Sequence, residues 1–247
     1  MKKSLLLVIA LGLSLSAMSQ SSRSADVDGD GDISLADLTL LANILVNRHD
    51  YVDLALPSGT LWATTNIGAI YPEEYGYYFA WGETSPKECY SWETYKWCDG
   101  TETSMTKYCI SSAYGQEDGL SELLPEDDAA YVLWGEEWRI PSLAQLEELC
   151  SECDWTWTTM FGVNGQMVSS RSNGNYIFLP AGGWIGETSY GVVGEKGYAW
   201  SRTINEEHCN GACYLGFTSS NGTQYTNNYY GRYGGWAIRP VRNSQQQ

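Results

Sequence analysis

One long stretch of the chain, residues 138–150, repeats apolar residues at the three- and four-residue spacing of a helix. Ser142 precedes the repeat and Gln145 follows three residues later, which is the pattern of an N-terminal capping box. We therefore expect a helix that begins after Ser142, turns Glu147 and Glu148 to water and lies against a sheet. Its apolar stripe consists of Leu143, Leu146, Leu149 and Cys150.

Short strand-like runs surround this helix. Two of them flank a Pro-Ser-Gly turn in residues 53–63, which predicts a hairpin at the start of the domain. Residues 72–83 predict a turn followed by an aromatic strand, whereas residues 84–137 are acidic and irregular, as in functional or variable loops. Further strands are expected over residues 175–181, 197–201, 212–217 and 236–242. Short strands around one main helix indicate an α+β domain.

The beginning of the chain has the features of an export signal. Met1-Lys2-Lys3 is basic, and the apolar run Leu5–Leu15 is too short to span a bilayer comfortably. Small residues follow at Ala17 and Ser19, so we expect residues 1–19 to be a signal peptide, with an uncleaved anchor as the alternative. No other apolar run is long enough to span a membrane. The mature chain is therefore expected in the periplasm, on the cell surface or secreted.

Residues 26–37 match a twelve-residue calcium loop. Carboxylates occupy loop positions 1, 3 and 5, glycine provides the sharp turn at position 6, and an acidic residue stands at position 12. Because Ca²⁺ takes six to eight oxygen ligands, this spacing predicts a calcium site, with a solvated Asp/Gly linker as the alternative. The expected ligands are Asp26, Asp28, Asp30, the Asp32 carbonyl, Ser34 through water, and Asp37.

Residues 25–48 resemble one repeat of a type I dockerin, because Asp stands at loop position 12 and a Leu-rich helix follows. The resemblance implies docking to a cohesin-like partner through loop positions 10 and 11, here Leu35 and Ala36. Dockerins carry two repeats, and this chain has no second Asp-x-Asp-x-Asp-Gly. The two apolar residues can instead pack on the main domain.

Composition narrows the choice of partners. The chain has 14 Lys and Arg against 30 Asp and Glu, a formal net charge of -16. Nucleic acids and anionic membranes are therefore poor partners, since a phosphate backbone needs a basic face. The 11 Trp and 18 Tyr combine apolar area with a hydrogen-bonding edge, which suits a binding surface as well as a core.

Successive blocks of residues 51–242 resemble the Fibrobacter succinogenes major paralogous (FISUMP) domain. The resemblance implies a fold similar to the C-type lectins and sulfatase-modifying factors, and an exported protein of the kind abundant in Bacteroidetes-type bacteria. It implies little about activity. Thr65 stands where relatives often have Cys, so any disulfide made there is missing. The blocks are residues 51–83, 138–141, 153–158, 173–181, 198–201 and 238–241.

Sugar binding is better supported by the residue types than catalysis is. The tripeptides Glu-Pro-Asn, Gln-Pro-Asp and Trp-Asn-Asp of calcium-dependent C-type lectins do not occur in the chain. Stacking of a sugar on aromatic rings beside polar amides is the remaining mode, although Trp184 and Trp236 are also typical core residues. The candidate ligand-binding residues are Trp184, Asn227, Asn228, Tyr229, Tyr230 and Trp236.

Seven cysteines, an odd number, leave at least one outside intramolecular pairs. Cys150 and Cys153 stand at the C-terminal end of the predicted helix, whereas a redox pair needs the N-terminal end, where the dipole stabilises a thiolate. Structural disulfides are the favoured interpretation for these two and for Cys209 and Cys213. Free thiols are one alternative, and zinc held together with His208 is another.

These features favour a binding module over an enzyme. There are two histidines, no Gly-x-Ser-x-Gly elbow and no phosphate loop, and no carboxylate spacing singles out a glycosidase pair. We expect an exported non-enzymatic module whose lectin-like domain contacts a glycan or a cell-surface protein. A component of a polysaccharide-degrading assembly, docked through the calcium segment, is the second hypothesis. The third is an oxidoreductase similar to the formylglycine-generating enzymes, with copper at Cys209 and Cys213.

Overall fold

The computed structural model describes residues 32–35, 37–38, 49–219, 224–225 and 229–243. The chain divides into two units, Met1–Arg48 and His49–Gln247, and each is considered by itself. The predicted signal peptide lies outside the described residues. Within the described ranges, no helix combines the length and the apolar character needed to cross a membrane.

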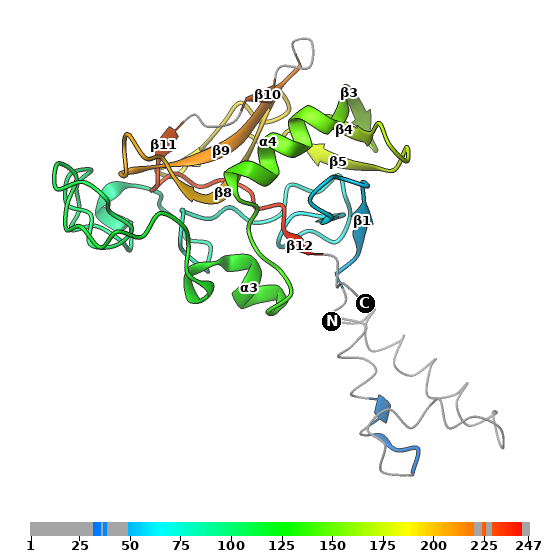
Figure 1. Ribbon diagram of the computed structural model, residues 1–247, viewed down its shortest axis with the longest axis horizontal. Coiled ribbons are helices and arrows are strands. Elements are labelled where there is room, and N and C mark those ends of the chain that lie inside the picture. The colour runs from blue at the N-terminus through cyan, green and yellow to red at the C-terminus, as the bar shows by residue number, and fades with distance from the viewer. Residues whose placement is uncertain (1–31, 36, 39–48, 220–223, 226–228, 244–247) are drawn as a thin grey trace. The chain divides into compact units, whose positions relative to one another are not determined.

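The larger unit is an α+β structure of small antiparallel sheets with few helices (Figure 1). One sheet joins the two ends of the unit, because β1 (Tyr51–Asp53) and β12 (Val241–Asn243) both pair with β2 (Thr60–Ala63). The predicted hairpin over residues 53–63 is confirmed by the pairing of β1 with β2. The first and last strands of the unit are therefore held in one sheet.

The remaining strands form three antiparallel groups. One group contains β3 (Cys153–Met160), β4 (Val163–Ser170) and β5 (Tyr176–Pro180) in that order. Another is centred on β9 (Gly211–Thr218), which pairs with β8 (Lys196–Ile204), β10 (Gln224–Tyr225) and β11 (Tyr229–Gly231). The third is the hairpin of β6 (Trp184–Gly186) and β7 (Ser189–Gly191). The strands predicted over residues 175–181, 197–201 and 212–217 are confirmed as β5, β8 and β9.

The aromatic strand predicted within residues 72–83 is wrong. Phe79 forms only an isolated bridge with Trp236, and the Trp81 N–H donates to the Arg232 carbonyl at 2.9 Å. Residues 78–81 are all buried, so this segment runs through the core without the alternation of a half-exposed strand. The last predicted strand is also shorter than expected, since only residues 241–243 are a strand there.

The predicted helix is confirmed as α4 (Leu143–Glu152), which contacts β3, β8 and β9 (Figure 1). Its capping box is complete: the Gln145 N–H donates to Ser142 Oγ at 3.2 Å, and the Ser142 N–H donates to Gln145 Oε1 at 3.0 Å. Glu148 differs from the expectation. Its carboxylate accepts hydrogen bonds from the N–H and hydroxyl of Ser58, at 2.8 and 2.5 Å, and so holds the β1–β2 turn.

Residues 84–137 carry little regular structure, as expected. They contain η2 (Trp92–Thr94), η3 (Pro125–Asp127) and α3 (Ala129–Trp134). A fully buried Arg232 holds the segment in place, because its guanidinium donates to the carbonyls of Lys107 and Tyr108 at 3.2 and 3.1 Å and contacts the Met105 sulfur. Irregular backbone is thus fixed by a side chain from the far end of the sequence.

Candidate functional site

A hollow of ≈ 500 Å³ in the larger unit has an aromatic and acidic lining. We call it the aromatic hollow. Three segments build it, namely the start of η2, the β6–β7 hairpin and the chain from β11 to residue 233. Its principal lining residues are Trp92, Trp184, Tyr230, Tyr233, Glu93 and Glu187. The four rings are half-buried and the two glutamates are exposed, so the rings offer partly open apolar surface beside charge.

The β6–β7 hairpin fixes Trp184 at one side of the hollow. A Cβ at Gly186 or Gly191 would lie 2.6 or 2.5 Å from atoms of the Trp184 ring, so the indole lies directly over backbone that only glycine leaves open. The hairpin is anchored to the core because Ile185 and Gly235 exchange two hydrogen bonds of 2.8 Å each. The ring is therefore presented on a rigid support.

Trp92 and Tyr233 form another part of the lining. Their ring centroids are 4.7 Å apart, and a Cβ at Gly231 would approach ring atoms of Tyr233 and Trp92 to 2.7 and 3.1 Å. The nearby Tyr230 ring lies 6.1 Å from that of Tyr233 and 5.0 Å from that of the buried Trp236. The surface rings are thus continuous with the aromatic core.

Two polar groups of the hollow, Tyr233 and Glu93, have shifted pKa values. Burial, followed by the hydrogen bond with Tyr230, raises the pKa of Tyr233 to about 12, so its hydroxyl is neutral at physiological pH. The hydrogen bond from the Ser91 side chain lowers the pKa of the exposed Glu93. The hollow therefore combines phenol hydroxyls and a carboxylate acceptor with aromatic faces, which suits a ligand that has hydroxyl groups and an apolar face.

The structure separates the ligand-binding residues expected from the sequence. It brings Trp184 and Tyr230 to the same hollow. Trp236 is 1% exposed and stacks on Trp200 with ring centroids 4.0 Å apart, so it is a core residue. Asn227 and Asn228 lie outside the described residues, and Tyr229 is described only as backbone of β11, opposite Cys213.

Four of the six principal lining residues were not identified from the sequence, namely Trp92, Glu93, Glu187 and Tyr233. Two of them lie in the irregular segment 84–137, where no periodicity directs attention to any residue. The repeated glycines beside aromatic residues in Tyr230–Trp236 are the signal that could have found Tyr233, because they mark close approach of rings to backbone.

The cysteines are arranged differently from the predicted grouping. Cys209 Sγ lies 3.0 Å from Cys109 Sγ, a residue the sequence did not single out. Cys213 Sγ instead donates to the Ile204 carbonyl at 3.4 Å. Burial raises the pKa of Cys150 to about 12 and that of Cys153 to about 11, so both remain thiols at neutral pH. The copper pair of the third hypothesis thus has its two cysteines in different environments.

The candidate zinc ligands do not form a cluster in the described ranges. No group of three or more His, Cys, Asp and Glu side chains there is arranged to hold a metal ion. The His208 ring, one of the candidate zinc ligands, has Nδ1 2.6 Å from the Tyr114 hydroxyl.

Only the second half of the predicted calcium loop is described, since Asp26, Asp28 and Asp30 lie outside the described residues. Residues 35 and 37–38 are helical, and the Ser34 N–H donates to Asp37 Oδ2 at 2.6 Å. Asp37 is 2% exposed, whereas Asp32 is exposed. Loop positions 9 and 12 are thus drawn together at a helix start. A simple N-terminal cap produces the same contact.

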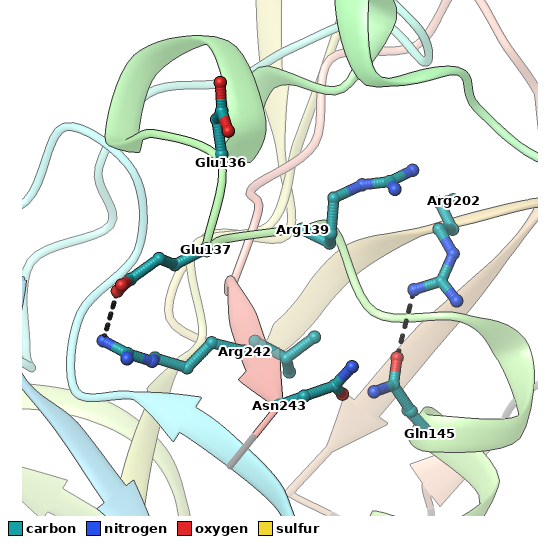
Figure 2. A pocket seen from close by; sticks show the side chains of 8 residues that line it. Glu136, Glu137, Arg139, Gln145, Arg202, Arg242 and Asn243 are labelled. Atoms are coloured by element: carbon teal, nitrogen blue, oxygen red, sulfur yellow. Dashed lines mark hydrogen bonds and ion pairs between the residues drawn. The ribbon is translucent and has the colours of Figure 1, made fainter. Parts of the chain in front are cut away.

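A second hollow, of ≈ 340 Å³, gathers three arginines (Figure 2). Arg242 bonds to Glu137 at 2.8 Å, and Arg202 Nη1 donates to Gln145 Oε1 at 3.1 Å, as the dashed lines show. Arg202 also pairs with Glu122 at 2.9 Å, and Arg139 pairs with the buried Asp128 at 2.7 Å. Each guanidinium already has an internal carboxylate, so this cluster is a structural ion-pair network, and the aromatic hollow is the better candidate site.

Comparison of the chain with protein-family models, with curated proteins and with solved structures finds no match.

Proposed function

We propose that the chain is an exported, non-enzymatic binding module that contacts a glycan through the aromatic hollow of a lectin-like domain. The observation that carries this proposal is the convergence of four half-exposed aromatic rings and two exposed glutamates on one hollow of ≈ 500 Å³. That size lies within the usual range of about 300–1,000 Å³ for ligand pockets.

The chemistry of the lining matches a pyranose ring. The faces of aromatic rings carry partial negative charge, so they attract the slightly positive C–H groups on one face of a sugar. Glutamate oxygens accept hydrogen bonds from sugar hydroxyls, and tyrosine hydroxyls can donate or accept them. Rings held by glycine contacts and backbone bridges need little rearrangement on binding, which lowers the entropic cost of association.

Replacing Trp184 with alanine is expected to weaken glycan binding about 10- to 100-fold, because truncating an interfacial anchor ring costs about 1.4–2.8 kcal/mol. The measurement is capture of the mature chain on plant polysaccharides, mucin and bacterial surface extract, followed by titration of the captured glycan. Phe161→Ala is the matched control, since this ring is 88% exposed and lies outside the hollow. Equal affinity of Trp184→Ala and wild type would contradict the site.

The two glutamates also favour a second ligand class, a cationic amine enclosed by aromatic rings. Titration of an amino sugar beside the corresponding neutral sugar separates the two. If the wild type prefers the amino sugar and the double variant Glu93→Gln with Glu187→Gln loses that preference, the hollow binds cations. Equal binding of both sugars would support recognition of the ring face.

We further propose that the N-terminal unit binds calcium and serves as a tether or brace. The buried position of Asp37 and its bond to the Ser34 N–H support this, because positions 9 and 12 must converge around the ion. Docking of this unit to a cohesin-like partner in a polysaccharide-degrading assembly, through Leu35 at loop position 10, is the second proposed role.

The combined substitution Asp26→Ala and Asp37→Ala is expected to weaken Ca²⁺ binding at least about tenfold, since two of the carboxylate ligands are lost. Calorimetric titration of the mature chain with Ca²⁺ measures this, with Asp99→Ala, an exposed carboxylate of the larger unit, as control. A Ca²⁺ affinity that does not change in the double variant would contradict the calcium site. Capture of the partner that survives chelation would contradict docking through the calcium loop.

A further inference from the structure

Cys109 and Cys209 meet inside the larger unit although 100 residues separate them in the sequence. Their Sγ atoms are 3.0 Å apart, and the two residues are 0% and 1% exposed. Cys109 Sγ also lies 3.1 Å from the Ser111 carbonyl. A pair of buried sulfur atoms this close is poised for a covalent bond, provided that the backbone on each side can support it.

The backbone around Cys109 is held on both sides. The N–H groups of Tyr108 and Cys109 donate to the Asp118 carboxylate at 2.7 and 3.0 Å. The N–H groups of Asp118 and Gly119 donate in return to the Cys109 carbonyl at 2.9 and 3.2 Å. This reciprocal set of bonds fixes Cys109 without any contribution from its sulfur.

The backbone around Cys209 is fixed by an independent set of bonds. Asn205 Oδ1 accepts from the N–H groups of Glu207 and His208 at 3.1 and 2.9 Å, and the Gly211 N–H donates to the His208 carbonyl at 2.8 Å. The His208 ring lies 2.6 Å from the Tyr114 hydroxyl, so residues 109–118 and 208–209 already contact each other beside the two sulfurs.

We propose that Cys109 and Cys209 form a disulfide that ties the irregular segment 84–137 to the β8–β9 connection. The reaction joins the two sulfur atoms and removes two protons and two electrons. A disulfide-containing oxidant accepts the electrons: one cysteine thiolate attacks it to give a mixed disulfide, and the second thiolate then displaces the oxidant's thiol. The bond goes beyond the glycan-binding proposal and stands on different residues.

The burial of the two cysteines indicates that they are oxidised during folding and not afterwards. Burial and the contact with Cys209 raise the pKa of Cys109 to about 11, so Cys109 is a thiol in the folded chain at neutral pH. Because the thiolate is the reactive species, oxidation proceeds while the chain folds, and the finished bond is shielded from reductants. The two segments that the bond joins, residues 84–137 and the β8–β9 connection, contain few strands or helices. A covalent bond between them adds a link where ladders of strand or helix hydrogen bonds are few.

Mass-spectrometric mapping of the mature chain tests the pairing. The chain is refolded from denaturant with reduced and oxidised glutathione, alkylated and digested without reduction. A peptide pair joined through Cys109 and Cys209 is the expected product. Recovery of both cysteines in alkylated form, or joined only to other cysteines, would overturn the proposal.

Thermal unfolding provides a second measurement. Cys109→Ser with Cys209→Ser is expected to lower the Tm of the oxidised chain by about 5–15 °C, as for a disulfide that closes a long loop. Cys89→Ser, at a half-buried cysteine, is the control and should leave Tm unchanged. If the double variant does not fold, the Tm of the wild type is measured with and without reductant instead. A wild-type Tm that reductant does not lower would overturn the proposal.

Discussion

Replacing Arg239 with methionine is expected to lower the free energy of unfolding by about 3–5 kcal/mol, because several buried acceptors lose their donor at once. Arg239 is 1% exposed and donates to Asn66 Oδ1 at 2.8 Å and to the carbonyls of Ala63, Thr64 and Phe178 at 3.1, 3.0 and 2.9 Å. It therefore joins β2, the chain after β2 and β5. Methionine fills similar volume but donates no hydrogen bond.

The charge of Arg239 makes the substitution informative. Burial removes the guanidinium from water and so lowers the pKa of Arg239. Its four hydrogen bonds offset that cost, and lysine at this position keeps the charge without the planar fork. Arg239→Lys is therefore expected to fall between wild type and methionine. If charge were the whole contribution, lysine would match the wild type.

Urea unfolding followed by tryptophan fluorescence measures these differences. Arg171→Met is the matched control, because this arginine pairs with Asp154 while 52% of its side chain is exposed. Arg171 also donates to the carbonyls of Ser151 and Cys153, but water competes for the bonds of an exposed guanidinium, so the control should lose much less than Arg239→Met. A loss for Arg239→Met as small as that of the control would contradict the assigned role.

Replacing Asp128 with alanine is expected to cost about 3–5 kcal/mol, since it removes a helix cap and leaves a charge without its buried partner. Asp128 is 0% exposed and caps α3 by accepting from the Ala130 and Tyr131 N–H groups at 2.9 and 3.3 Å. Its other oxygen accepts from Arg139 Nε at 2.7 Å, and both oxygens lie near the Ile140 N–H. One carboxylate therefore connects α3 to the chain that leads into α4.

Asparagine separates the two roles of Asp128. It retains a capping oxygen, but its amide group would face the Arg139 donor, so Asp128→Asn should lose part of the stability that alanine loses. A double-mutant cycle with Arg139→Met isolates the ion pair. Glu122→Gln, in the half-exposed pair with Arg202, is the control, with an expected loss below about 1 kcal/mol. Independent, additive effects of Asp128 and Arg139 would contradict the coupling.

Local interactions explain what could be predicted from the sequence. The α4 cap joins groups three residues apart, the β1–β2 hairpin turns within a few residues, and β5, β8 and β9 are apolar runs of strand length. The coarse α+β class follows from these elements. The strand predicted at residues 78–81 was wrong because these residues are all buried, so their apolar character does not alternate. An unbroken apolar run of this length is the same for a strand and for an irregular segment of the core.

The sequence by itself determined the α+β class, the start of the central helix, the opening hairpin and an acidic spacing suited to calcium, because each depends on residues within about a dozen positions. Only the tertiary structure decided that Trp236 is core while Trp92 and Tyr233 line the hollow with Trp184, and that Cys109 meets Cys209. Such pairings join residues far apart in the sequence, 100 positions apart for Cys109 and Cys209, and they are set by the packing of the sheets, which no local pattern encodes.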